Sequence, residues 1–122
     1  MTRVIIAGSR DFNDFNLLCS ACDRILGGTN SIEIVSGAAK GADALGEKYA
    51  GERGYTLVQF PADWDKNGRF APFTRNKEMA EYANMLIVFW DGKSTGTKNM
   101  IKYAKLNGLE IHIIEVEKEL NR

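Results

Sequence analysis

The sequence of 122 residues is poor in the side chains that build metal and disulfide sites, with one histidine and two cysteines. A structural zinc site needs four ligands, which Cys19, Cys22 and His112 cannot supply. The two cysteines also recur at helical spacing with Leu18 and Leu26, a pattern typical of one apolar helix face. We therefore expect buried structural thiols and no metal site.

An excess of charge of either sign is also lacking, because sixteen basic residues balance sixteen acidic ones. No overall positive field would attract a nucleic acid backbone or an anionic membrane, so any anion site must be local. No apolar run reaches the roughly 20 residues that a membrane span needs, and the first residues lack the pattern of a signal peptide. The sequence predicts a cytoplasmic protein without a membrane partner, and it disfavours a nucleic acid partner.

What the sequence does contain is an ordinary globular composition, with 44% hydrophobic and 26% charged residues. We expect residues 1–122 to form one domain. Apolar runs alternate with helical patterns, which is typical of a βαβ series. Strands are expected over residues 3–7, 32–35, 56–60, 85–90 and 110–116. Helices are expected over residues 14–26, 41–53, 72–84 and 97–107.

The composition of the strands predicts their order in the sheet. Residues 4–7 and 85–90 are continuously apolar, as in strands covered on both faces, whereas 56–60 and 110–116 carry polar residues typical of edges. With right-handed crossovers the order is 3-2-1-4-5. The expected fold is α/β, a Rossmann-like three-layer domain with a five-stranded, mostly parallel sheet. Ligands of such sheets bind beyond the carboxyl ends of the first and fourth strands, at the switch point.

The loop after the first strand contains Gly8, Ser9 and Arg10. The glycine permits a tight turn, and the hydroxyl and guanidinium suit a phosphate. Alternatively, the segment is a simple turn with a surface arginine. Arg75 and Asn76, in the expected first turn of the third helix, are further candidates for binding phosphate or ribose.

The loop after the second strand is rich in small residues and leads into a helix. Ser36, Gly37, Lys40 and Gly41 are candidate phosphate-binding residues here, because free amides at a helix start attract anions. Asp43 falls in the first helical turn, where capping or bracing of the loop is favoured over catalysis.

The loop after the fourth strand again precedes a helix. A Walker A loop is excluded, because Ile87 stands where that motif needs a glycine. The loop instead forms a candidate phosphate nest at the switch point. Its candidate residues are Asp91, Gly92, Ser94, Thr95, Gly96 and Thr97.

Residues 64–73 are expected to form an irregular loop, and long loops over a site are often lids. Lys66 and Arg69 lie in it. Trp64, Phe70 and Trp90 could offer a ring to a base, although buried packing is favoured for each.

Four stretches combine into a resemblance. They are GSRDF at 8–12, SGAAKGAD at 36–43, TRNKEM at 74–79 and FWDGKSTGT at 89–97. Together they resemble the YspA-like family of the SLOG superfamily, whose relatives include the LOG phosphoribohydrolases and DNA-processing protein A. The resemblance implies a Rossmann-like sheet that binds nucleotides or nucleotide-derived signals. LOG proteins commonly dimerise, so it also favours a homodimer or higher homo-oligomer.

The resemblance to LOG enzymes is incomplete. Those enzymes carry an arginine ahead of the fourth strand and a P-G-G-x-G-T-x-E-E loop, whose arginine and glutamate act in cleaving a base from a ribose phosphate. Arg75 falls at the arginine position, and Gly96 and Thr97 match the glycine and threonine. Asn99 and Met100 stand where the glutamates would be. A LOG-type reaction would therefore need a relocated carboxylate.

These observations favour a protein that senses or sequesters a small nucleotide or nucleotide derivative and requires no other cofactor. The alternative is an N-glycosidic hydrolase acting on a nucleoside phosphate or an ADP-ribose-like molecule, with Arg75, Asp91 and Asp43 as candidate catalytic residues. A DNA-binding accessory protein comes third, because the neutral net charge does not favour it.

Overall fold

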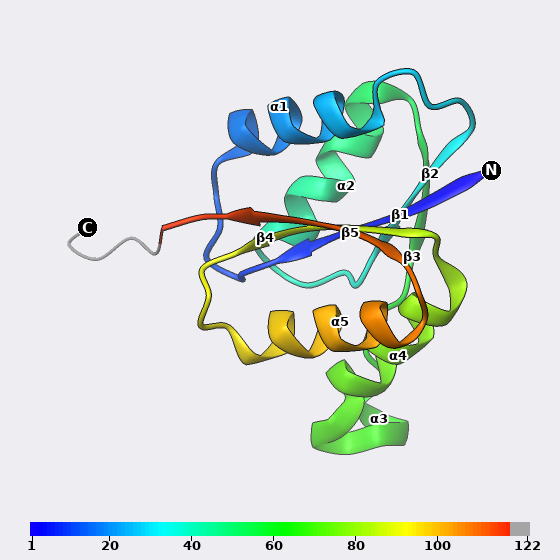
Figure 1. Ribbon diagram of the computed structural model, residues 1–122. Coiled ribbons are helices and arrows are strands. Elements are labelled where there is room, and N and C mark those ends of the chain that lie inside the picture. Colours follow the sequence, from blue (N-terminus) through cyan, green and yellow to red (C-terminus); the bar gives the residue numbers. More distant parts are fainter. Residues whose placement is uncertain (118–122) are drawn as a thin grey trace.

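The structure is a computed structural model that describes residues 1–117, and Figure 1 shows its arrangement. Every pair of neighbouring strands is parallel, in the order β3-β2-β1-β4-β5. The predicted order is confirmed, and the sheet is parallel throughout. The strands are β1 Thr2–Gly8, β2 Ile32–Ser36, β3 Thr56–Gln59, β4 Met85–Trp90 and β5 Glu110–Glu115.

Helices cover both faces of the sheet, which gives the expected three layers. In Figure 1, α1 and α2 lie on one side of the sheet and α4 and α5 on the other. The helices are α1 Phe15–Leu26, α2 Ala42–Arg53, α3 Trp64–Asn67, the 3-10 helix η1 Gly68–Phe70, α4 Ala71–Tyr82 and α5 Thr95–Leu106. Within residues 1–117, no helix has the length and apolar character needed to cross a membrane.

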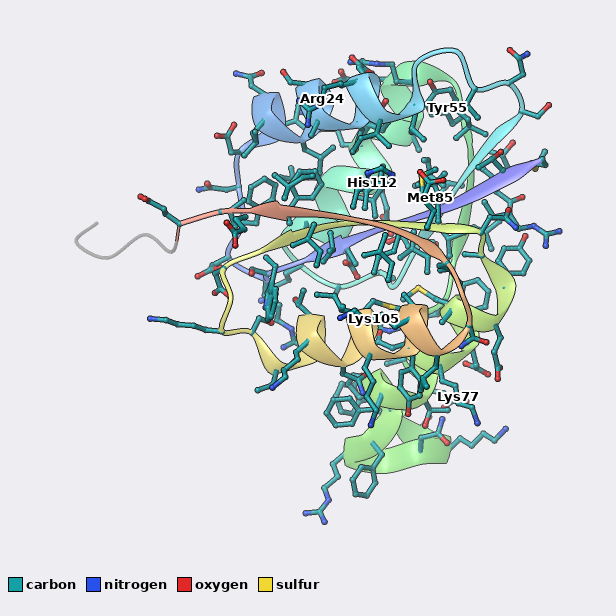
Figure 2. All side chains as sticks on the ribbon, in the orientation of Figure 1. Arg24, Tyr55, Lys77, Met85, Lys105 and His112 are labelled. Carbon is teal, nitrogen blue, oxygen red and sulfur yellow. The ribbon has the colours of Figure 1, made fainter. Side chains whose placement is uncertain are left out.

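The alternation of side chains along β1 explains why its residues 4–7 are continuously apolar. Val4 and Ile6 pack into the core on the side of α1 and α2, whereas Ile5 and Ala7 pack into the core under α4 and α5. In Figure 2, side chains fill the space between the sheet and the helices on both sides. Met85, the first residue of β4, is labelled there and shows where the sheet lies. A strand covered on both faces therefore favours a continuous apolar run.

The segment over residues 64–73 corrects the predicted irregular loop. The side chain of Asp63 accepts a hydrogen bond from the amide of Lys66 at 3.1 Å and so caps α3. Gly68, with φ of +57°, then turns the chain into η1. Trp64 and Phe70 are each 56% exposed, so the favoured packing role is wrong for both.

The two cysteines are free thiols in α1. Cys22 is fully buried as expected, whereas Cys19 is only partly buried against the same core. Burial raises the pKa of Cys22 to about 12 and also raises the pKa of Cys19. Since the thiolate is the reactive form, the environment of Cys22 suppresses its chemistry.

Cys22 is expected to react with iodoacetamide at pH 8 more than about a hundredfold slower in the native protein than in guanidinium chloride, because the folded state both buries and protonates it. Mass spectrometry of the alkylated protein over time measures both rates. Equal rates in the two states would show that α1 opens readily.

Candidate functional site

The loops after β1, β2 and β4 meet at the carboxyl end of the sheet. The backbone amide of Ser9 donates to the carbonyl of Phe89 at 3.0 Å. The carbonyl of Ser9 in turn accepts from the amide of Ala42, the first residue of α2, at 3.2 Å. One short segment therefore joins the end of β4 to the start of α2.

Two of the predicted glycines allow these backbones to approach so closely. A Cβ on Gly8 would lie 2.2 Å from the carbonyl oxygen of Phe89. A Cβ on Gly41, where φ is +73°, would lie 2.3 Å from the carbonyl oxygen of Ser9. Both distances are far below van der Waals contact, so any other residue would force the loops apart.

The loops enclose two adjoining hollows. The first, which we call the inner recess, has a volume of about 70 Å³ and is lined by residues that include Gly8, Asp43 and Arg75. The second, the outer cleft, has a volume of about 560 Å³. Arg10, Pro72, Ser94 and Gly96 line both. The recess and the cleft therefore form one continuous site at the switch point.

Arg75, on α4, is a buried cation in the wall of the inner recess. Its Nε donates to the side-chain oxygen of Asn76 at 3.0 Å, and its Nη1 donates to the carbonyl oxygens of Gly37 and, at 3.5 Å, Phe60. Burial lowers the pKa of Arg75, although Asp43 opposes this effect. Backbone carbonyls thus hold the guanidinium in one orientation, as a phosphate or carboxylate site requires.

Asp43 lies beside Arg75 and is 6% exposed. Its Oδ2 accepts a hydrogen bond from the amide of Ala39 at 3.2 Å. Burial raises the pKa of Asp43 to about 6, and the Ala39 amide and the Arg75 and Arg10 cations only partly oppose this. The predicted bracing contact is present, and the carboxyl group additionally borders the inner recess.

Ser9 and Arg10 line the outer cleft, and they differ sharply in exposure. Ser9 is 2% exposed, and its hydroxyl has no hydrogen-bond partner within residues 1–117. Arg10 is exposed at the junction of cleft and recess. A buried hydroxyl without a partner is costly, which marks an unmet hydrogen-bonding capacity at this point of the site.

The loop after β4 is held by its own polar side chains. The carboxylate of Asp91 accepts from the amides of Lys93 and Ser94, each at 2.8 Å. The hydroxyl of Ser94 accepts from the amide and the hydroxyl of Thr97 and caps α5. These contacts present the start of α5, including Gly96, to the inner recess.

Asn76 ties the start of α5 to α4. Its Nδ2 donates to the carbonyl of Gly96 at 3.3 Å and to the side-chain oxygen of Asn99 at 2.9 Å. Asn76 thereby links Asn99 to Arg75, whose Nε donates to the Asn76 side-chain oxygen. Asn99 therefore has a positioning contact where the LOG enzymes have a glutamate.

Other predicted residues lie behind the recess or outside it. The hydroxyl of Ser36 donates to Glu47 at 2.8 Å, towards α2. Gly37 packs behind Arg75, because a Cβ there would lie 2.6 Å from Nη1. Lys40 and Gly92 are exposed and line neither hollow.

Several residues that line the site were not predicted. Ala39 and Pro72 border the inner recess, and Phe73 borders the outer cleft. Phe73 falls where the predicted loop over residues 64–73 overlaps the predicted helix over 72–84, and no sequence pattern assigned it to the site. Pro72 correctly signalled the helix start, which the structure places at Ala71.

Comparison with known proteins supports the fold. The X-ray structure of DNA processing protein A from Streptococcus pneumoniae matches with a TM-score of 0.72 and 18% identity, over 98% of this chain and 52% of that one. The chain thus spans about half the length of that protein and shares its fold.

The search of curated proteins gave no match. The family model described as "YspA, cpYpsA-related SLOG family" matches residues 2–67. Because this match spans more than half of the chain, the protein belongs to the YspA, cpYpsA-related SLOG family.

Proposed function

We propose that the protein binds a phosphate-bearing nucleotide or nucleotide derivative at this site, as a sensor or a sequestering protein. The observation that carries the proposal is the pairing of a buried, oriented Arg75 with an exposed Arg10 around one recess at the switch point. Guanidinium groups match the geometry of phosphate oxygens. The start of α5 also lines this recess, and the start of a helix favours an anion.

The unpartnered hydroxyl of Ser9 is independent support for a ligand. A phosphate or sugar oxygen in the outer cleft would give this buried group the hydrogen bond that it lacks. The volumes suit the same interpretation. The inner recess, at about 70 Å³, has room for a small group such as a phosphoryl group. The outer cleft, at about 560 Å³, has the size of ordinary small-molecule sites.

Binding without turnover is favoured by the residues at the start of α5. The side-chain oxygen of Asn99 is occupied by Asn76, and Met100 is buried. An amide and a thioether cannot deprotonate water or stabilise a developing ribosyl cation. The position that carries a glutamate in LOG enzymes thus lacks a group for their reaction.

Asp43 favours a second candidate function, an N-glycosidic hydrolase. Its carboxyl group borders the inner recess, and burial raises its pKa to about 6. A carboxyl group with such a pKa suits general acid and base catalysis near neutral pH. Incubation with nucleoside monophosphates and ADP-ribose, followed by chromatography, separates the two functions. Release of free base that Asp43→Asn abolishes would establish the hydrolase, and intact nucleotides together with a raised melting temperature would support the binder.

Arg10→Ala is expected to weaken binding of the best nucleoside monophosphate by about 10- to 150-fold, since a hydrogen bond to a charged group contributes about 1.5 to 3 kcal/mol. Isothermal titration calorimetry measures the change. Arg24→Ala is the matched control, because Arg24 is exposed on the last turn of α1 and lines neither hollow (Figure 2). Equal affinity of the Arg10 variant and the wild type would remove Arg10 from the site.

A further inference from the structure

Phe73 is an aromatic side chain at the ligand site that the proposed function leaves unused. It lies in the first turn of α4, two residues after the buried Ala71 that begins the helix. Its side chain is 37% exposed and borders the outer cleft. A half-open ring at the edge of a cleft of this size is accessible to a bound molecule.

The other aromatic residues near the site make contacts with other parts of the protein. Phe12 stacks on Phe89 in the core, with ring centroids 5.0 Å apart. The indole nitrogen of Trp90 donates to the carbonyl of Ser94 at 3.2 Å. Phe70 lies in η1, with the Arg69 guanidinium 5.0 Å from its ring centroid. Among the described residues that line the outer cleft, Phe73 is the aromatic one.

The charges along the site indicate which end of a nucleotide lies at Phe73. The inner recess carries Arg75 and shares Arg10, against one buried carboxyl group, Asp43. The outer cleft adds the carboxylates of Asp11 and Asp91, of which Lys93 offsets one. A phosphate is therefore favoured at the inner end, and the sugar and base extend outward into the cleft.

Resting on the proposed function, we propose that Phe73 stacks on the base of a nucleotide whose phosphate occupies the inner recess. The ligand class is then a nucleotide with its planar base intact, rather than a sugar phosphate alone. Aromatic rings stack on the faces of all bases with little preference between them. Stacking on Phe73 would thus favour ligands that carry a base over ligands that lack one. Selectivity between different bases would come from the polar groups of the cleft.

The test compares nucleotide with ribose 5-phosphate, which has the same sugar and phosphate but no base. Calorimetric titration first identifies which of AMP, GMP, CMP and UMP the wild type binds most tightly. We expect this nucleotide to bind at least about fivefold more tightly than ribose 5-phosphate, in line with a stacking contribution of about 1 kcal/mol or more. Phe73→Ala is expected to abolish this difference by weakening the nucleotide alone. Phe73→Tyr is expected to retain it.

Two controls keep the outcomes distinct. Unchanged affinity of Phe73→Ala for ribose 5-phosphate shows that the variant keeps its fold and its phosphate site. Phe70→Ala removes a comparable exposed ring from the adjacent η1 and is expected to change neither affinity. The inference is overturned if Phe73→Ala weakens both ligands equally, or weakens neither. If the wild type binds neither ligand, the proposed function itself fails.

Discussion

Gly41→Ala is expected to lower the free energy of unfolding by about 4 kcal/mol, combining backbone strain of about 1 to 3 kcal/mol with overpacking of similar size. The new Cβ would lie 2.3 Å from the carbonyl oxygen of Ser9 and 2.5 Å from that of Arg10. Both neighbours are backbone atoms, which cannot rotate away. The loops after β1 and β2 must separate, so nucleotide binding should be lost together with stability.

Urea unfolding followed by circular dichroism measures the change in stability. Gly51→Ala is the matched control, because Gly51 lies in α2 with no other heavy atom within 4 Å of the added Cβ. Helix propensity alone predicts that this control gains about 0.8 to 1 kcal/mol. A Gly41 variant as stable as the wild type would show that the contact between the two loops is dispensable.

Asp43→Asn is expected to stabilise the protein at pH 7.5 by up to about 3 kcal/mol, at 1.36 kcal/mol for each unit of pKa change. Burial raises the pKa of Asp43 from its usual 3.8 to about 6. The folded protein therefore binds this proton more tightly than the unfolded chain, and the wild type loses stability as the pH rises from about 4 to about 6. Asparagine stays neutral throughout that range. The difference between variant and wild type should thus be near zero at pH 4 and reach its maximum above pH 6.

Asp23→Asn provides a control of opposite sign. Hydrogen bonds from Arg53 and Tyr49 lower the pKa of Asp23, so its carboxylate stabilises the fold at neutral pH and loses this effect as the pH falls. This variant should be less stable than the wild type at pH 7.5 and approach it at low pH. Urea unfolding at several pH values tests both variants. A constant difference between Asp43→Asn and the wild type from pH 4 to 7.5 would contradict the raised pKa.

The strand order could be predicted from the sequence because the amino-acid composition of each strand reflects how far its two faces are buried. Residues 4–7 of β1 and all of β4 are apolar and lie between the two helical layers, whereas β3 and β5 have exposed positions that accept Thr56, Gln59 and Glu110. The loops after β1 and β4 followed from that order, since parallel strands place their carboxyl ends together. Strand composition, together with the rule of right-handed crossovers, therefore predicted where the candidate site lies.

Details of the site depend on contacts between residues far apart in the sequence, which periodicity does not record. Asp43 occupies a first helical turn, where carboxylates are usually solvated, and only the packing of Arg75 and Gly37 around it shows its burial. The sequence predicts Ser36 as a phosphate-binding residue because it adjoins a glycine-rich loop. In the structure its hydroxyl instead donates a hydrogen bond to Glu47 on α2. The short α3 was missed because its four residues hold too few positions for a helical pattern.

The strand order also bears on how the chain folds as it leaves the ribosome. β1 emerges well before β4, which begins only at Met85, yet one edge of β1 pairs with β4. Until then, the apolar residues Val4 to Ile6 belong to a strand with an open edge, a template for pairing with other chains. Long-range parallel pairing of this kind also slows folding. Synthesis of β4 is therefore the step that allows this edge of β1 to be paired.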